Sequence, residues 1–168
     1  GRVLEVGVGT GLNFPYYPKD AQITAIDLSD KMLECAHQHT ARRDYSNLEL
    51  LPMDAQALAF PHESFDFVVA TFVFCSAPDP VLGLSELRRV CKRDGRIVLL
   101  EHMRPENPWL GKLFDLLNPL VVRLMGANIN RRTVENVRRA GLEIERLENL
   151  APSGIVKLIV ATVAIPPP

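Results

Sequence analysis

The stretch EVGVGTGLNFPYYP, from Glu5 to Pro18, directly follows a short apolar run and places glycine at three alternate positions. Glycine at Gly7, Gly9 and Gly11 lets the backbone turn sharply out of a strand, and it lets a ligand approach without meeting a Cβ atom. The stretch therefore predicts a strand followed by a loop on which a flat or polar ligand comes to rest.

Two common nucleotide-binding loops do not fit this stretch. The dinucleotide fingerprint needs its third glycine one place later, where this chain has Leu12, so an NAD-dependent oxidoreductase is a poor match. A phosphate-binding P-loop requires a following Gly-Lys-Ser/Thr, and that triplet does not follow. The loop alone therefore leaves the identity of the ligand open.

The rest of the chain alternates short apolar runs with helical patterns, which is typical of a parallel sheet with crossover helices. We expect seven strands, at residues 3–6, 23–28, 48–51, 65–74, 96–100, 142–147 and 156–164. Helices are expected after the caps Ser29 and Asp79, the second with Cys91 on its buried face and Gly95 ending the segment, and over residues 133–140. Between residues 101 and 132 we expect two short helices, broken at Asn118 and ended near Gly126.

Composition limits the function classes. The 168 residues fit a single domain, and 19 basic against 20 acidic residues give no electrostatic footprint for nucleic acid. Three cysteines without CxxC spacing argue against a disulfide framework and against a metal site. The longest apolar stretches are interrupted by charges and prolines, so we expect no leader or spanning helix and a cytoplasmic protein.

Acidic residues stand where two of the expected strands end. Asp27 ends the second strand, where a carboxylate can accept hydrogen bonds from both hydroxyls of a ribose. Asp54 follows the third strand, where a carboxylate can accept from the amine of an adenine, although such a residue alone is more often a loop cap. Together with the glycine loop, they predict a nucleoside site.

With these features in place, the chain resembles the class I S-adenosylmethionine-dependent methyltransferases. The branch includes quinone-biosynthesis C-methyltransferases, bacterial phosphatidylethanolamine N-methyltransferases and membrane-associated thiol methyltransferases. The resemblance rests on VLEVGVGTG, ITAIDLSDKML, LLPMDAQALAFPHESFDFVVA and ELRRVCKRDGRIVLLEH, in the family's order over about the first hundred residues. It implies a Rossmann-like, doubly wound α/β fold with a seven-stranded, mostly parallel sheet, an antiparallel last strand and helices on both faces.

The resemblance also implies a cofactor site for S-adenosylmethionine. Its expected residues shape the methionine pocket, hold the ribose, flank the adenine, or lie beside the amino-acid end of the cofactor. The methionine pocket is assigned to Glu5, Gly7, Gly9 and Gly11, and the ribose to Asp27. The adenine is assigned to Leu28, Met32, Asp54 and Ala55, and the amino-acid end of the cofactor to Thr71 and Phe72.

The methyl acceptor is expected at residues 102–130, where the family inserts an acceptor lid. The stretch NPWLGKLFDLLNPLVVRLMG is apolar, so we expect a small-molecule or lipid acceptor, with Trp109 and Phe114 as its contacts. The same stretch could instead lie on a membrane face as a peripheral contact, or consist of ordinary core helices. Arg131 and Arg132 could meet a phosphate head group, or form a solvated pair.

Methyl transfer needs mainly an in-line approach within about 3–3.5 Å, so no catalytic triad is expected. His102 is a candidate base or substrate contact, or a structural hydrogen-bonding residue, and Tyr17 is a candidate pocket residue. Phosphatidylethanolamine nitrogen is the preferred acceptor, followed by a quinone-ring carbon and by a small molecule or thiol. A non-catalytic nucleoside-binding module is the alternative from another class, and an RNA methyltransferase is disfavoured because a basic stripe is missing. We also expect an N-terminal cap segment to precede Gly1 in the working enzyme.

Overall fold

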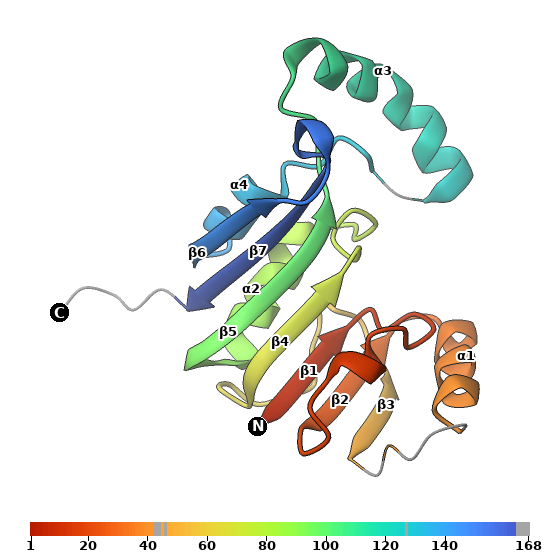
Figure 1. Cartoon of the computed structure of the whole chain (residues 1–168), viewed down its shortest axis with the longest axis vertical. Helices are drawn as coiled ribbons and strands as arrows, with labels where there is room; N and C mark the ends of the chain where they lie inside the picture. Colours follow the sequence, from red (N-terminus) through yellow and green to blue (C-terminus); the bar gives the residue numbers. More distant parts are fainter. Residues whose placement is uncertain (42–44, 46, 127, 164–168) are drawn as a thin grey trace, which may run out of the picture.

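The computed structural model describes residues 1–41, 45, 47–126 and 128–163. Seven strands form one sheet, most of the helices lie beside it, and one helix lies beyond the carboxyl end of the fifth strand (Figure 1). The strands are β1 (Arg2–Val6), β2 (Gln22–Asp27), β3 (Leu48–Pro52), β4 (Phe65–Thr71), β5 (Cys91–His102), β6 (Leu142–Asn149) and β7 (Val156–Val163). The helices are η1 (Phe14–Tyr16), α1 (Asp30–Thr40), α2 (Pro80–Val90), α3 (Pro108–Met125), α4 (Thr133–Arg139) and η2 (Pro152–Gly154).

The order of strands confirms the predicted doubly wound sheet. It runs β3-β2-β1-β4-β5-β7-β6, and the pairs from β3 to β5 are parallel. Strand β7 inserts antiparallel between β5 and β6, as the resemblance implied. The chain order reverses between β1 and β4, and ligands of open α/β sheets bind at such a switch point, outside the carboxyl ends of the strands.

Helices cover both faces of the sheet, because alternate residues of each strand point to opposite sides. On one face, Leu4 and Val6 of β1 pack in a core with Leu84 and Leu87 of α2, and α4 joins the same core. On the other face, residues of β1 and β2 pack in a second core with α1 and η1. Two buried layers therefore fix the ends of β1, β2 and β4, from which the site is built.

The fourth and fifth strands differ from the sequence prediction. Strand β4 ends at Thr71 instead of residue 74, because Phe72 takes a left-handed φ of 57° that a strand cannot continue. Strand β5 begins at Cys91, so Cys91 is no helix residue and Gly95 lies inside the strand, next to a register irregularity. The expected last strand included Ala164, which lies outside the described residues; β7 runs to Val163.

The predicted break at Asn118 is wrong, and α3 is one helix of 18 residues. Asn107 caps its start by accepting from the amides of Trp109 and Leu110, and Gly126 ends it with φ 72°. Asn118 does not cap a second helix. Its side chain instead binds the chain beyond the helix, donating to Asn128 and accepting from the amide of Ile129.

Candidate functional site

In the glycine loop after β1, Gly7 and Gly11 are packed against other side chains, and Gly9 forms an open rim. All three glycines have left-handed φ, between 55° and 80°, which side-chain-bearing residues adopt only at a cost. A Cβ at Gly7 would come within 2.4 Å of Val73, and one at Gly11 within 2.4 Å of the Phe14 ring. A Cβ at Gly9 would meet nothing within 4 Å, so this glycine leaves its open side available to a ligand.

Asp27, at the end of β2, joins the glycine loop to the start of α1. Its Oδ2 accepts from the amide of Gly9 at 2.9 Å, and its Oδ1 accepts from the amide of Ser29 at 2.9 Å. An ionised carboxylate offers about four acceptor positions, so about two remain for other donors. The structure thus places the predicted ribose residue directly beside the glycine loop, with acceptor capacity to spare.

The expected adenine residues lie around the ends of β2 and β3. The side chains of Leu28 and Met32 are exposed, an arrangement that leaves their apolar surfaces free to cover a flat ring. Asp54 accepts from the amide of Gln56 at 2.8 Å, which is the loop-cap role that the sequence left open for it. Ala55 follows in the same turn, and the amide of Met53 donates to the carbonyl of Asp27 and joins the two strand ends.

Glu5 is buried at the base of the site, one residue before β1 ends. Its Oε1 accepts from the side-chain amide of Asn13 at 2.9 Å, and the same amide donates to the hydroxyl of Thr71 at 3.2 Å. Burial raises the pKa of Glu5 to about 7. Within the described residues, its Oε2 and the Tyr17 hydroxyl are both buried, and the two side chains are partners of each other.

Tyr17 lies against this carboxylate rather than at the solvent edge. Burial raises its pKa, and the nearby charge of Glu5 raises it further. The phenol therefore stays protonated at neutral pH, which suits a residue that shapes the pocket and does not suit a general base.

Phe72 and His102, predicted separately, are brought together at the ends of β4 and β5. Their rings stack with centroids 4.4 Å apart and planes 21° apart. The left-handed φ of Phe72 is strained for a non-glycine residue, and such strain persists where neighbours hold it. Here Glu101 Oε1 holds the following turn by accepting from the amides of Val73 at 2.9 Å and Phe74 at 3.0 Å.

Two residues of the site were missed by the sequence analysis. Asn13 connects Glu5 to Thr71, and Glu101 fixes the turn after β4; burial raises the pKa of Glu101 to about 7. An acidic residue ending the apolar run before His102 was a visible indication of Glu101. Nothing in the local pattern distinguished Asn13 from an ordinary loop residue.

Within the part of the chain that the structure describes, the expected acceptor residues take no part in the hydrogen bonds or the ring stacking of this network. Trp109 lies on α3 with 80% of its surface exposed, and Phe114 is half-buried on the same helix. Over the described ranges, no three His, Cys, Asp or Glu side chains gather as metal ligands. The Cys75 thiol is buried with a raised pKa, so it is not an activated nucleophile.

Comparisons with known proteins show the family to which the chain is similar. Residues 4–99 match the family model described as a methyltransferase domain. The chain is 45% identical over 103 residues to a phosphatidylethanolamine N-methyltransferase of Cereibacter sphaeroides, covering 61% of this chain and 51% of that protein. It is 30% identical over 135 residues to the ubiquinone/menaquinone biosynthesis C-methyltransferase UbiE of Teredinibacter turnerae, covering 77% and 54%.

A solved structure gives the same result for the fold. The crystal structure of the YcgJ protein of Bacillus subtilis matches with a TM-score of 0.75 at 26% identity, over 89% of this chain and 65% of that one. The chain spans about half the length of the curated relatives it matches. Because the family model covers more than half of the chain, including the glycine loop, Asp27 and Asp54, the chain belongs to the methyltransferase domain family.

Proposed function

We propose that this chain transfers a methyl group from S-adenosylmethionine to a hydrophobic or lipid-like acceptor, and that the preferred acceptor is the amine of phosphatidylethanolamine. The observation that carries the methyl-transfer part is the Asp27 carboxylate held against the amide of Gly9, beside an open glycine rim. That arrangement receives a nucleoside with a polar tail.

The residues of the site fit S-adenosylmethionine. Asp27 has acceptor capacity for ribose hydroxyls, and Leu28 and Met32 offer exposed apolar surface to an adenine. Hydrogen bonds among Glu5, Asn13 and Thr71 hold the base of the loop, where they shape the pocket for a methionine tail. The cofactor supplies an activated methyl group on a sulfonium.

The chain's own contribution is positioning. Methyl transfer depends on holding the two reactants at close range and in line, which a rigid site achieves without a nucleophilic residue. The Glu5–Asn13–Thr71 hydrogen bonds join β1 to β4, and Glu101 fixes the turn that follows β4. His102, stacked on Phe72 at the end of β5, remains the candidate to take a proton from an amine acceptor.

The choice of acceptor rests on the similarity to the Cereibacter sphaeroides enzyme and on the apolar helix α3, which follows the site along the chain. The similarity to the UbiE protein supports a second candidate, methylation of a quinone-ring carbon. A small thiol or other small molecule is a third acceptor class. The acceptor lid at residues 102–130 and an N-terminal cap remain proposals as well.

Transfer of tritium from methyl-labelled S-adenosylmethionine tests the proposal. The protein is offered detergent-dispersed phosphatidylethanolamine, a demethylated quinone and a small thiol in separate reactions. Label in the phospholipid supports the amine acceptor, and label only in the quinone or the thiol moves the assignment to that class. Cofactor binding without label in any acceptor contradicts the proposed transfer and favours a non-catalytic nucleoside-binding module.

A further inference from the structure

Helix α3 carries a stripe of large apolar side chains that none of the other described elements covers. Figure 1 shows the helix standing beyond the end of β5, away from the sheet. Trp109 is 80% exposed and Leu116 is 76% exposed. Val122 apart, the exposed large apolar residues share one side of the helix at 3.6 residues per turn. They are Trp109, Leu113, Leu116, Leu117, Leu120 and Leu124, and we call them the outer stripe.

Polar contacts on the opposite side of α3 hold the outer stripe toward solvent. Asp115 forms a salt bridge with Arg104 at 2.8 Å. Asn118 donates to Asn128 at 3.1 Å and accepts from the amide of Ile129 at 2.9 Å. These contacts hold the helix in one rotation about its axis, so the outer stripe stays exposed and does not pack into the core.

The charges around the outer stripe favour an anionic surface as its partner. Lys112 and Arg123 lie along the same margin of the stripe by helical spacing, and among the described residues neither forms an ion pair. Asp115 is the only acidic residue of α3, and Arg104 neutralises it. Lys112 also lies over the Trp109 ring, 5.4 Å from its centroid.

We propose that the outer stripe of α3 docks on a lipid bilayer that contains anionic lipid. An amphipathic helix with Trp and Leu on one side and basic residues beside them lies in the interface plane, with its apolar residues in the acyl boundary and its cations among the phosphates. Tryptophan suits this depth, because its ring is apolar and its N–H is polar. None of the described helices is both long and apolar enough to cross a bilayer.

A bilayer explains the surface better than a second copy of this chain does. A second copy of this chain would present the same unopposed cations, Lys112 and Arg123, to each other across a two-fold axis. Docking would also turn the end of β5, with His102, toward the membrane, because α3 follows that strand (Figure 1). The inference concerns binding alone, so it stands or falls independently of which atom is methylated.

Trp109 allows a direct test, because it is the only tryptophan of the chain. Vesicles of phosphatidylcholine with one quarter phosphatidylglycerol should shift its fluorescence to the blue, and brominated lipid should quench it. Added salt should weaken the effect, because the cations are surface-exposed. Fluorescence that stays unchanged, at lipid concentrations where the protein sediments with the vesicles, would place the contact elsewhere and overturn the proposal.

A matched pair of leucines separates the outer stripe from general surface hydrophobicity. Leu113→Gln should lower vesicle partitioning about fivefold. About half of the Leu113 side chain is exposed, and in the variant this apolar surface no longer contacts the acyl chains. Leu82→Gln is the control: Leu82 of α2 is 49% exposed and Leu113 is 47% exposed. Leucine and glutamine have similar helix propensities, so both variants keep their helices. Equal losses in the two variants would contradict a specific docking surface.

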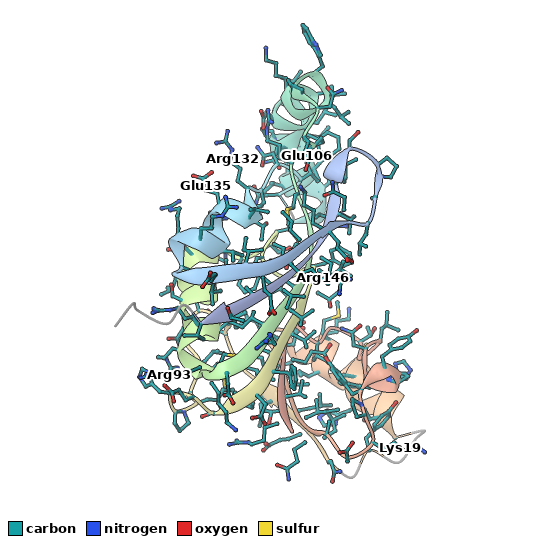
Figure 2. All side chains as sticks on the ribbon, turned by 60° about the vertical axis from the view of Figure 1, so that its left-hand side comes forward. Lys19, Arg93, Glu106, Arg132, Glu135 and Arg146 are labelled. Carbon is teal, nitrogen blue, oxygen red and sulfur yellow. The ribbon has the colours of Figure 1, made fainter. Side chains whose placement is uncertain are left out.

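A matched pair of lysines tests the charge. Lys112→Ala should weaken binding to the anionic vesicles about fivefold and leave binding to pure phosphatidylcholine unchanged. Lys19→Ala should change neither, since Lys19 lies at the opposite end of the molecule from α3 (Figure 2). Self-association that Leu113→Gln abolishes, without any vesicle binding by the unmodified chain, would assign the stripe to a second copy. Methyl transfer to a detergent-dispersed acceptor needs no vesicle, so that assay measures catalysis separately from membrane binding.

Discussion

Among single residues, Asp27 has the most specific proposed role, because its carboxylate organises the loop and is the proposed acceptor for ribose hydroxyls. Asp27→Asn keeps the shape and removes the charge. We expect a loss of about 1.5–3 kcal/mol in binding S-adenosylhomocysteine, or roughly 10- to 150-fold, since hydrogen bonds to charged groups are worth this much. Isothermal titration calorimetry measures it.

The control for Asp27→Asn is Glu34→Gln, which removes a charge from an exposed position of α1. It should leave the affinity unchanged. Both variants are first compared with the parent chain by thermal unfolding, because Asp27 also holds two backbone amides. An unaltered affinity in a folded Asp27→Asn protein would remove Asp27 from the cofactor site.

Residues with visible local patterns were predictable, and residues with long-range partners were not. The glycines and Asp27 were predicted because a strand end and a turn constrain residue type locally. Asn13 was missed because its role depends on Thr71, which is 58 residues away in sequence. The left-handed Phe72 was missed because Glu101, 29 positions later, supports the turn after it.

At the scale of elements, the strands were predicted well and the longest helix was not. A buried strand shows itself as an apolar run, so the two buried layers of the sheet left a clear pattern. The Asn118-Pro119 pair has the same appearance as a helix start, and sequence alone cannot tell the two cases apart. In the structure Pro119 lies inside α3, with its ring exposed and Asn118 engaged by the following chain.

Pro119→Ala tests that α3 is continuous. Interior proline costs a helix roughly 3 kcal/mol relative to alanine, and its rigidity returns up to about 1 kcal/mol through the unfolded state. We therefore expect local opening of α3 to become harder by about 2 kcal/mol. Native-state hydrogen exchange of the α3 amides measures this opening.

Pro108→Ala is the matched control, because Pro108 is the first residue of α3, where proline is well tolerated. It should change the opening of α3 little. If Pro119→Ala made opening easier, Pro119 would be favouring a helix start in solution, and the two-helix prediction would hold.

For the whole molecule, two buried carboxylates set an unusual pH dependence of stability. Burial raises the pKa of both Glu5 and Glu101 from the usual 4.5 to about 7. Between these values the folded chain holds protons that the unfolded chain has released, so the free energy of unfolding falls as pH rises. Each carboxylate should cost roughly 3 kcal/mol at pH 8, a cost that is absent below about pH 4.5.

Partly exposed carboxylates change the free energy of unfolding in the opposite direction as pH rises. The effect of a buried carboxylate is therefore best measured as the difference in stability between a variant and the parent chain. Arg89 lowers the pKa of Glu86, and Lys92 lowers that of Asp66; these groups add stability that is lost in acid. Glu101→Gln keeps an oxygen that can accept from the amides of Val73 and Phe74.

Glu101→Gln should therefore be more stable than the parent chain at pH 8, with the advantage shrinking toward pH 4.5. Urea unfolding at both pH values measures the difference. A variant that is less stable than the parent at pH 8 would mean that Glu101 is ionised in the fold, held by the amides of the turn. In that case the turn after β4, and not burial, would control the charge at this edge of the sheet.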